Sequence, residues 1–454
     1  MNDHPAIIWG TRSISHQRLE QYVSSVVKQL KGRGMGSKDR LAIIEPNSVE
    51  YVIILLALWR MGVVACPLNP RLPYEGLIQC CGALNPKAVL TSQTSFVSSK
   101  KLTMPVIALK DLISFDARQS VETVVQDIPL EQEVTIIWTS GTSSNPKAAV
   151  HTWGNHVYSA RGSQEVIPLK ADDRWVLSLP LYHVSGISIV CRCFLAGATL
   201  VVPPEEDLAE VIRKARPTHI SLVATQLYRL LEHKDNQVLL RSLKYILLGG
   251  SAIPRSLLEK ALSLQLPVYV SYGLTEMSSQ VATGKVEASD QPCARLLPYR
   301  QLKIDSDGQI LVKGEVLFKG YLHQNKIALP LTKDGWFKTG DLGKLEHGCL
   351  SVLGRLDNMF ICAGENIQPE EIENVLLRLP QVKEAVVVPK EDAQYGTRPV
   401  AFIRTEGTFN EQFLNTHCIQ HLPKIKVPVC FYPWPEELVT QGIKISRKFF
   451  LSRL

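Results

Sequence analysis

Short apolar runs alternate with amphipathic helical segments through the first half of this chain and beyond. Residues 16–31 carry apolar side chains at helical spacing, and an apolar run follows at 41–44. The order then repeats, with a helical segment at 49–61 and an apolar run at 63–66. Strands that alternate with helices are typical of a parallel α/β sheet. We therefore predict an α/β fold, with a further helix at 74–84 and further strands at 88–90, 175–178, 199–202, 219–223, 245–248 and 268–270.

The length of 454 residues exceeds one ordinary core, so we expect more than one domain. From about Leu302, glycine turns separate short strands, which indicates a small β-rich subdomain with strands at 309–313, 315–320 and 349–353. The pattern after residue 355 is mixed, with a helix at 369–379 and strands at 385–389 and 400–404. We predict a large N-terminal domain over 1–355 and a smaller, mobile α+β domain over 356–454.

Charge and cysteine usage exclude several classes of protein. The net charge of +7 is spread along the chain, whereas a nucleic-acid partner would need a concentrated basic patch. The ten cysteines do not form a disulfide scaffold, and Cys80-Cys81 and Cys191/Cys193 lack zinc-binding spacing, so we expect reduced core cysteines. The most apolar stretch, 51–58, is too short to cross a bilayer. No secretory signal begins the chain, so we predict a cytoplasmic protein.

A polar loop follows a buried strand at 135–150, which reads TIIWTSGTSSNPKAAV. Five hydroxyl side chains, one glycine and Lys147 lie within its nine central residues. Hydroxyl and backbone N–H groups can donate to phosphate oxygens while an ammonium offsets their charge. The Walker pattern is absent, so a solvated polar turn stays open beside a phosphate site.

Four further motifs follow in order, reading YGLTE at 272–276, TGD at 339–341, GRLD at 354–357 and GIK at 442–444. Together the five resemble the adenylate-forming superfamily of acyl-CoA synthetases, luciferases and peptide-synthetase adenylation domains. Longer strings resemble the o-succinylbenzoate–CoA ligases of menaquinone biosynthesis, among them PKAAVHT at 146–152, SLPLYHVSG at 178–186 and GENIQPEE at 364–371. The resemblance implies an ATP-dependent ligase that makes o-succinylbenzoyl-CoA through an acyl-adenylate, releasing pyrophosphate and AMP.

The resemblance also implies a nucleotide site. Thr275 would bind the α-phosphate, and Glu276 would hold Mg²⁺, which prefers carboxylate oxygen. A helix-start carboxylate is the alternative for Glu276, a turn for Asp341 and a surface ion pair for Arg355. The expected contacts to ATP are Thr139, Ser140, Gly141, Thr142, Ser143 and Lys147 around the triphosphate, Gly249, Gly250, Ser251, Tyr272 and Gly273 around adenine, Asp341 at the ribose, and Arg355 at the ribose or phosphate.

The small domain has three implied roles. Lys444 would neutralise the α-phosphate during adenylation, although a lysine in a C-terminal tail is usually only solvated. Asp357 lies where the family has its hinge, and Gly364 lies on the loop expected beside the pantetheine of coenzyme A. The domain would then close for the first step and turn for the second.

The resemblance also implies a pocket for the acid substrate. His183 corresponds to an aromatic gate, and Ser185, Thr225, Gln226 and Arg229 are candidates for the aromatic acid, with core histidine and helix packing as alternatives. The segment 293–299 lacks the family's glycines, and Arg295 within it could pair with a substrate carboxylate. Another aryl- or acyl-CoA ligase, or a nucleotide-binding protein without turnover, therefore stays open. A homodimer is a further expectation.

Overall fold

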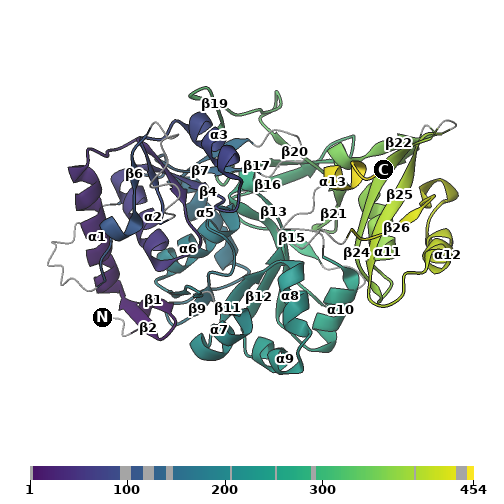
Figure 1. Cartoon of the computed structure of the whole chain (residues 1–454), viewed down its shortest axis with the longest axis horizontal. Coiled ribbons are helices and arrows are strands. Elements are labelled where there is room, and N and C mark those ends of the chain that lie inside the picture. The colour runs from purple at the N-terminus through teal and green to yellow at the C-terminus, as the bar shows by residue number, and fades with distance from the viewer. Residues whose placement is uncertain are drawn as a thin grey trace.

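The computed structural model describes residues 4–92, 104–115, 127–139, 147–204, 207–250, 253–287, 293–363, 365–392, 395–435 and 447–454. Within these residues a large N-terminal part lies beside a smaller C-terminal part, which is yellow-green in Figure 1. The large part contains two sheets with helices packed against their faces, as the alternating pattern predicts.

The larger sheet has 13 strands in the described residues, in the order β16-β17-β20-β21-β15-β14-β13-β12-β11-β9-β10-β1-β2. Its centre, from β13 to β1, is parallel, and antiparallel strands extend it at both ends. The strands are β1 (Pro5–Trp9), β2 (Arg12–Ser15), β9 (Arg174–Val176), β10 (Thr199–Val201), β11 (His219–Leu222), β12 (Tyr245–Gly249), β13 (Val268–Leu274), β14 (Ser279–Lys285), β15 (Ala294–Leu296), β16 (Gln301–Ile304), β17 (Gln309–Lys313), β20 (Phe337–Glu346) and β21 (Cys349–Arg355).

The second sheet has eight strands among the residues described, in the order β19-β18-β8-β7-β4-β3-β5-β6. Its strands β7, β4, β3, β5 and β6 are parallel, and β8 pairs antiparallel with both β7 and β18. The strands are β3 (Arg40–Ile44), β4 (Val64–Leu68), β5 (Ala88–Leu90), β6 (Val106–Ile107), β7 (Glu133–Trp138), β8 (Ala148–Thr152), β18 (Gly320–His323) and β19 (Lys326–Ala328).

Helices fill the space between the two sheets because the strands bury both faces. In β3, Leu41 and Ile43 belong to the core between the sheets, while Ala42 and Ile44 belong to the core on the other face. This alternation is the two-residue period of a strand. The helices that share the central core are α1 (His16–Gly32), α2 (Val49–Met61), α5 (Trp153–Gln164) and α6 (Val184–Ala196).

The outer faces carry the remaining helices of the large part. One core joins the second sheet to α3 (Tyr74–Leu84). Another core joins the larger sheet to four helices, α7 (Leu208–Ala215), α8 (Ala224–Leu231), α9 (Lys234–Arg241) and α10 (Arg255–Ser263). The large part therefore has five layers in the order helices, sheet, helices, sheet, helices.

The small part has its own cores, as expected for a separate domain. A three-stranded sheet, β24-β25-β26, packs against helices, and β22 and β23 form a short hairpin. Its elements are β22 (Phe360–Cys362), β23 (Glu365–Ile367), α11 (Pro369–Leu376), β24 (Val382–Asp392), β25 (Gly396–Thr405), α12 (Glu411–His421), β26 (Phe431–Pro433) and α13 (Arg447–Leu451).

Two local predictions were wrong. The strand expected at 315–320 begins only at Gly320, and residues 315–319 form a turn region in which Phe318 and Lys319 donate their backbone N–H groups to the carbonyls of Glu276 and Val150. The strand expected at 268–270 is longer than predicted and runs as far as Leu274, because the added residues pair with β14. The β-rich region after Leu302 is present, and its strands continue the two large sheets.

The cysteine prediction needs one correction. Cys293 of the segment before β15 and Cys349 of β21 form a disulfide, although they are 56 residues apart in sequence. Cys80, Cys81, Cys191 and Cys193 are free, as expected. A search of the described residues finds no helix long and apolar enough to cross a membrane.

Candidate active site

Several predicted site residues lie where parallel strands of the larger sheet end. β9 leads to Ser178, β11 leads into α8, β12 ends at Gly249, and β13 ends beside Thr275. The ends are joined, since Ser178 accepts a hydrogen bond from Gln226 of α8 and Gly249 pairs with β13. Carboxyl ends of parallel strands share one edge of the sheet, where α/β proteins bind ligands. The fold therefore gathers these loops at one edge.

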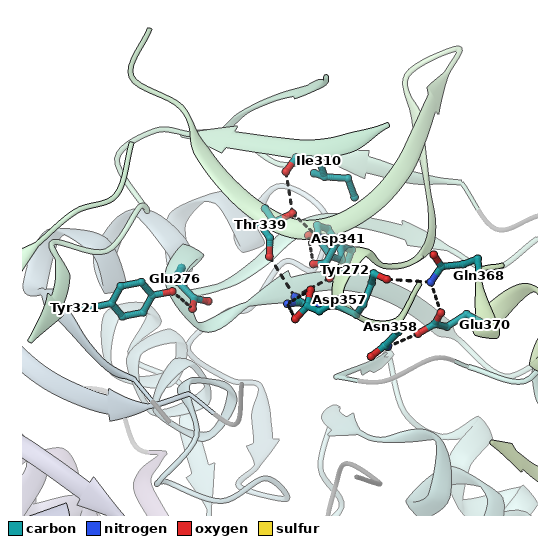
Figure 2. A network of polar contacts seen from close by, with 11 residues as sticks. Tyr272, Glu276, Ile310, Tyr321, Thr339, Asp341, Asp357, Asn358, Gln368 and Glu370 are labelled. Carbon is teal, nitrogen blue, oxygen red and sulfur yellow. Dashed lines mark hydrogen bonds and ion pairs between the residues drawn. The ribbon is translucent and has the colours of Figure 1, made fainter. Parts of the chain in front are cut away.

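Asp341 of β20 is the centre of a polar cluster at this edge (Figure 2). The residue is 8% exposed, and its carboxylate accepts hydrogen bonds from Tyr272 Oη at 2.6 Å and from Arg355 Nη1 at 2.9 Å. Burial, reinforced by the Asp341 charge, raises the pKa of Tyr272 well above its ordinary value, so the phenol stays a donor. Three of the predicted nucleotide contacts are thus brought together.

Thr275 and Glu276 lie in η2 (Thr275–Met277), directly after β13. The Thr275 carbonyl accepts a hydrogen bond from His151 Nε2 of β8 at 2.8 Å. Glu276 Oε1 accepts a hydrogen bond from Tyr321 Oη of β18 at 2.6 Å. Because β8 and β18 belong to the second sheet, these contacts tie the motif to both sheets.

Lys147 and Thr139 close the two ends of the predicted phosphate loop. Thr139 N donates to the Lys147 carbonyl at 2.8 Å, which continues the pairing of β7 with β8. Lys147 Nζ lies 5.0 Å from the ring centroid of Tyr321. The predicted phosphate lysine and the predicted metal carboxylate therefore contact the same tyrosine.

Glycines at the strand ends permit a close approach of the backbones. A Cβ atom on Gly249 would lie 2.9 Å from the Ser271 carbonyl oxygen, and one on Gly273 would lie 2.1 Å from that of Ser279. Gly250 has a φ of +86°, a conformation that side chains disfavour. These positions keep β12, β13 and β14 close together beside Tyr272.

We expect Gly273→Ala to weaken both folding and ATP binding, because the new methyl group would push β13 away from β14 and move Tyr272 from Asp341. Overpacking of this kind costs about 1–3 kcal/mol of unfolding free energy. Urea unfolding and ATP titration measure the two effects. Gly76→Ala in α3 is the matched control, since a Cβ there meets no atom within 4 Å. Unchanged ATP affinity in Gly273→Ala would contradict this expectation.

The predicted acid-pocket residues His183 and Ser185 lie at the start of α6, where His183 is the N-cap. Ser188 Oγ lies 3.3 Å from Ser279 Oγ, and this contact joins α6 to β14. The ring of His183 contacts that of Tyr182, with centroids 4.6 Å apart. The start of α6 therefore faces the strand that follows η2.

Arg192 is a functional candidate that sequence reasoning missed. It is 4% exposed, it donates to Gln280 Oε1 at 2.6 Å, and no carboxylate pairs with it among the described residues. Its Nε has no hydrogen-bond partner there either. Burial lowers the pKa of Arg192 to about 10, which still leaves it charged at neutral pH. Seven residues, or two helical turns, separate Arg192 from Ser185, so the two share one face of α6.

A second buried guanidinium adds to this positive region. Arg300 donates to the carbonyl oxygens of Gln280 and Pro298 at 2.6 Å and has no carboxylate partner among the residues described. Burial, and then the charge of Arg192, lower the pKa of Arg300 to about 9. Buried charges without a counter-ion are costly, so an anionic ligand is favoured here. The sequence signal was a single arginine inside the apolar run 189–195.

The predicted acid-pocket residues of α8 contact the backbone and the small domain or are exposed. Gln226 uses both amide atoms on the backbone, accepting from Val223 N at 3.0 Å and donating to the Ser178 carbonyl at 3.2 Å. Thr225 and Arg229 are exposed, and the charge of Arg229 acts on Glu384 of the small domain. Arg295 is exposed on β15, opposite Thr283. Substrate roles for Thr225, Gln226, Arg229 and Arg295 stay predictions.

A chain of contacts crosses from the large to the small part at the predicted hinge (Figure 2). Arg355 Nη2 lies 3.1 Å from Asp357 Oδ2, and Gln368 Nε2 donates to the Arg355 carbonyl at 3.1 Å. Glu370 accepts from Asn358 Nδ2 at 2.5 Å. Figure 2 shows these groups beside the Asp341 cluster, so the hinge adjoins the predicted ribose site.

Arg447 attaches the C-terminal segment to α11. Its guanidinium donates to Glu370 at 3.0 Å and to Glu373 at 2.8 Å. Arg447 lies three residues after Lys444. The predicted site residues Ser140, Gly141, Thr142, Ser143, Ser251, Gly364 and Lys444 lie outside the described residues.

Comparison with known proteins identifies the class. Residues 1–322 match the AMP-binding enzyme family, and residues 371–439 match the AMP-binding enzyme C-terminal domain. The chain therefore belongs to the AMP-binding enzyme family. It is 34% identical over 445 residues to the 2-succinylbenzoate–CoA ligase of Salmonella typhimurium, covering 98% of this chain and 93% of that protein.

Solved structures agree in fold. The o-succinylbenzoate CoA synthetase (MenE) of Bacillus subtilis, in complex with the acyl-adenylate intermediate OSB-AMP, has a TM-score of 0.87 at 30% identity, covering 98% of this chain and 95% of that one. The same synthetase in complex with ATP and magnesium ion has a TM-score of 0.84 at 31% identity, covering 94% and 92%. The resemblance and the fold class predicted from the sequence are confirmed.

Proposed function

We propose that this chain is an ATP-dependent acid–CoA ligase of menaquinone biosynthesis that converts o-succinylbenzoate into o-succinylbenzoyl-CoA through an acyl-adenylate. The names of its relatives support this activity. The structural observation that carries it is the buried Arg192 without a carboxylate partner in the described chain. The substrate has two carboxylates, and only one reacts. The other needs a fixed cation, which Arg192 supplies.

In the first step, a substrate carboxylate oxygen attacks the α-phosphorus of ATP and pyrophosphate leaves. This step is needed because oxide is a poor leaving group and AMP is a better one. Catalysis then consists of positioning the reactants and stabilising phosphate charge. Lys147 and the loop from Thr139 would hold the triphosphate, Thr275 and Lys444 the α-phosphate, and Asp341 the ribose hydroxyl groups.

The residues around Glu276 fit a magnesium ion. Glu276 Oε1 accepts one hydrogen bond, from Tyr321, and the carboxylate keeps further lone pairs for a ligand. Carboxylate oxygen is the donor that Mg²⁺ prefers, and the ion usually binds through one or two carboxylates together with phosphate oxygens. When bound, Mg²⁺ would offset the charge of the triphosphate. Glu276 would hold it, and Lys147 would supply a second positive charge.

In the second step, the thiol of coenzyme A attacks the acyl carbonyl carbon and AMP leaves. Gly364 lies between β22 and β23 in sequence, and this hairpin belongs to the part of the small domain at the upper right of Figure 1, away from the large domain. We place the domain boundary between residues 355 and 356, with Asp357 as the hinge. Rotation there would withdraw Lys444 and bring the β22–β23 hairpin to the acyl group.

Acid preference separates this proposal from another aryl- or acyl-CoA ligase. We expect rapid pyrophosphate release with o-succinylbenzoate and slow release with benzoate or fatty acids, because only the first acid has a second carboxylate, besides the one that reacts, for Arg192. A continuous phosphate-coupled assay with each acid measures the rates. Equal rates with benzoate would favour the alternative. Binding of ATP without release from any acid would instead favour a nucleotide-binding protein.

Two finer predictions concern assembly and location. A homodimer and a cytoplasmic location stay predictions of the sequence. Light scattering of the purified protein and fractionation of cells measure them.

A further inference from the structure

Tyr321 is a residue that none of the predicted site motifs contains, yet it contacts both charged groups of the proposed phosphate site. Its strand, β18, pairs antiparallel with β8, and Tyr321 lies opposite Ala149, two residues after Lys147. The turn before β18 is attached to the motif of Glu276, since Phe318 N donates to the Glu276 carbonyl at 2.8 Å. The backbone alone therefore places Tyr321 between Lys147 and Glu276.

The side chain of Tyr321 then holds each charged group through a different part of the ring. Its hydroxyl donates to Glu276 Oε1 at 2.6 Å, and Figure 2 shows this contact beside the Asp341 cluster. Its π face receives Lys147, whose Nζ lies 5.0 Å from the ring centroid. The buried ring of Phe318 packs edge-on against Tyr321, with centroids 4.7 Å apart, and fixes its plane.

These two contacts orient the charges without neutralising either one. In the part of the chain that the structure describes, Lys147 has no carboxylate partner and Glu276 has no cationic one. A direct ion pair between them would occupy the carboxylate needed by the metal and the ammonium needed by the phosphate.

We propose that Tyr321 is a positioning residue that holds Glu276 for the magnesium ion and Lys147 for the triphosphate while keeping the two charges apart. The inference rests on the proposed function, in which Glu276 holds the metal. Tyr321 acts through its neighbours, so it is not itself a catalytic residue.

Calorimetric titration of ATP, without acid substrate, tests the two contacts separately. We expect Tyr321→Phe to bind ATP in EDTA as the wild type does, because the ring remains. In the wild type, added Mg²⁺ should tighten the binding of ATP. In Tyr321→Phe, the Mg²⁺ concentration that gives half of this effect should rise about tenfold, because Glu276 loses one hydrogen bond to its charged group. Tyr321→Leu should show the same change and also lose about threefold in affinity for ATP in EDTA, because Lys147 loses the ring.

Two further variants make the test specific. Tyr245→Phe in β12 removes the same oxygen from a half-buried ring that stacks on His219, and it should leave both titrations unchanged. In a Glu276→Gln background, Tyr321→Phe should add no further change in the magnesium titration. A wild-type magnesium titration in Tyr321→Phe would overturn the inference. If Glu276→Gln alone leaves the titration unchanged, the metal assignment itself fails and the inference fails with it.

Discussion

Arg192→Leu is expected to reduce kcat/KM for o-succinylbenzoate by about 100-fold or more, because truncating one partner of a buried charge pair costs about 2–5 kcal/mol. The affinity for ATP should change little, since Arg192 contacts Gln280 of β14 and not the Asp341 cluster. Steady-state pyrophosphate release against acid concentration measures the first quantity, and ATP titration measures the second.

The structure also predicts what Arg192→Leu leaves intact. Because no carboxylate of the described chain pairs with Arg192, replacing it with an apolar side chain removes no internal ion pair and only the buried hydrogen bond to Gln280, so the free energy of unfolding should fall by no more than about 1–3 kcal/mol and the variant should still fold. Arg241→Leu is a matched control, since this guanidinium is exposed and donates to the Leu264 carbonyl. A folded Arg192→Leu enzyme with full o-succinylbenzoate activity would contradict the proposed pocket.

Lys444→Ala is expected to reduce the rate of adenylation by about 100- to 1,000-fold, the effect of removing one group that stabilises transition-state charge. Thioester formation from supplied o-succinylbenzoyl-adenylate and coenzyme A should stay near the wild-type rate, because the proposed rotation of the small domain would remove the lysine from the site before this step. Single-turnover pyrophosphate release measures the first half-reaction, and consumption of the synthetic adenylate measures the second.

Lys448→Ala is the matched control for this change, because Lys448 lies exposed on α13, four residues further on. It should leave both half-reactions unaltered. Equal loss of both half-reactions in Lys444→Ala would be incompatible with a domain that alternates between two arrangements.

The helices and strands of the large domain were predictable where their signals are local. The helix expected at 49–61 is α2, since Ser48 caps its first turn and Gly62, with a φ of +70°, ends it. β5 and α3 also have their predicted bounds. These elements depend on spacing, caps and glycines within a few residues, which the sequence displays directly.

The errors arise from contacts between distant segments. The strand predicted at 268–270 extends to Leu274, because its residues pair with β14, which lies later in the sequence. The 56 residues between Cys293 and Cys349 hid a disulfide that becomes evident only when β15 lies beside β21. Tertiary pairing overrides local preference in both cases.

In the candidate site too, residues within local motifs were predictable and residues defined by distant contacts were not. Motif order identified Tyr272, Glu276, Asp341 and Arg355, and the structure joins Tyr272, Asp341 and Arg355 in one cluster. The order of motifs did not identify Arg192 or Tyr321, because the importance of these two residues depends on burial and on partners 88 and 45 residues away in sequence. A charged residue in an apolar helix was the one local signal for Arg192.

The central claim is that the protein forms the coenzyme A thioester of o-succinylbenzoate and of no other acid tested. Mass spectrometry of a reaction containing purified protein, MgATP, coenzyme A and o-succinylbenzoate, with benzoate and fatty acids in parallel, tests it most directly. The account predicts o-succinylbenzoyl-CoA and AMP from o-succinylbenzoate, and no thioester from the other acids. A thioester from another acid, with none from o-succinylbenzoate, would contradict the assigned substrate, and no thioester from any acid would contradict the ligase activity itself.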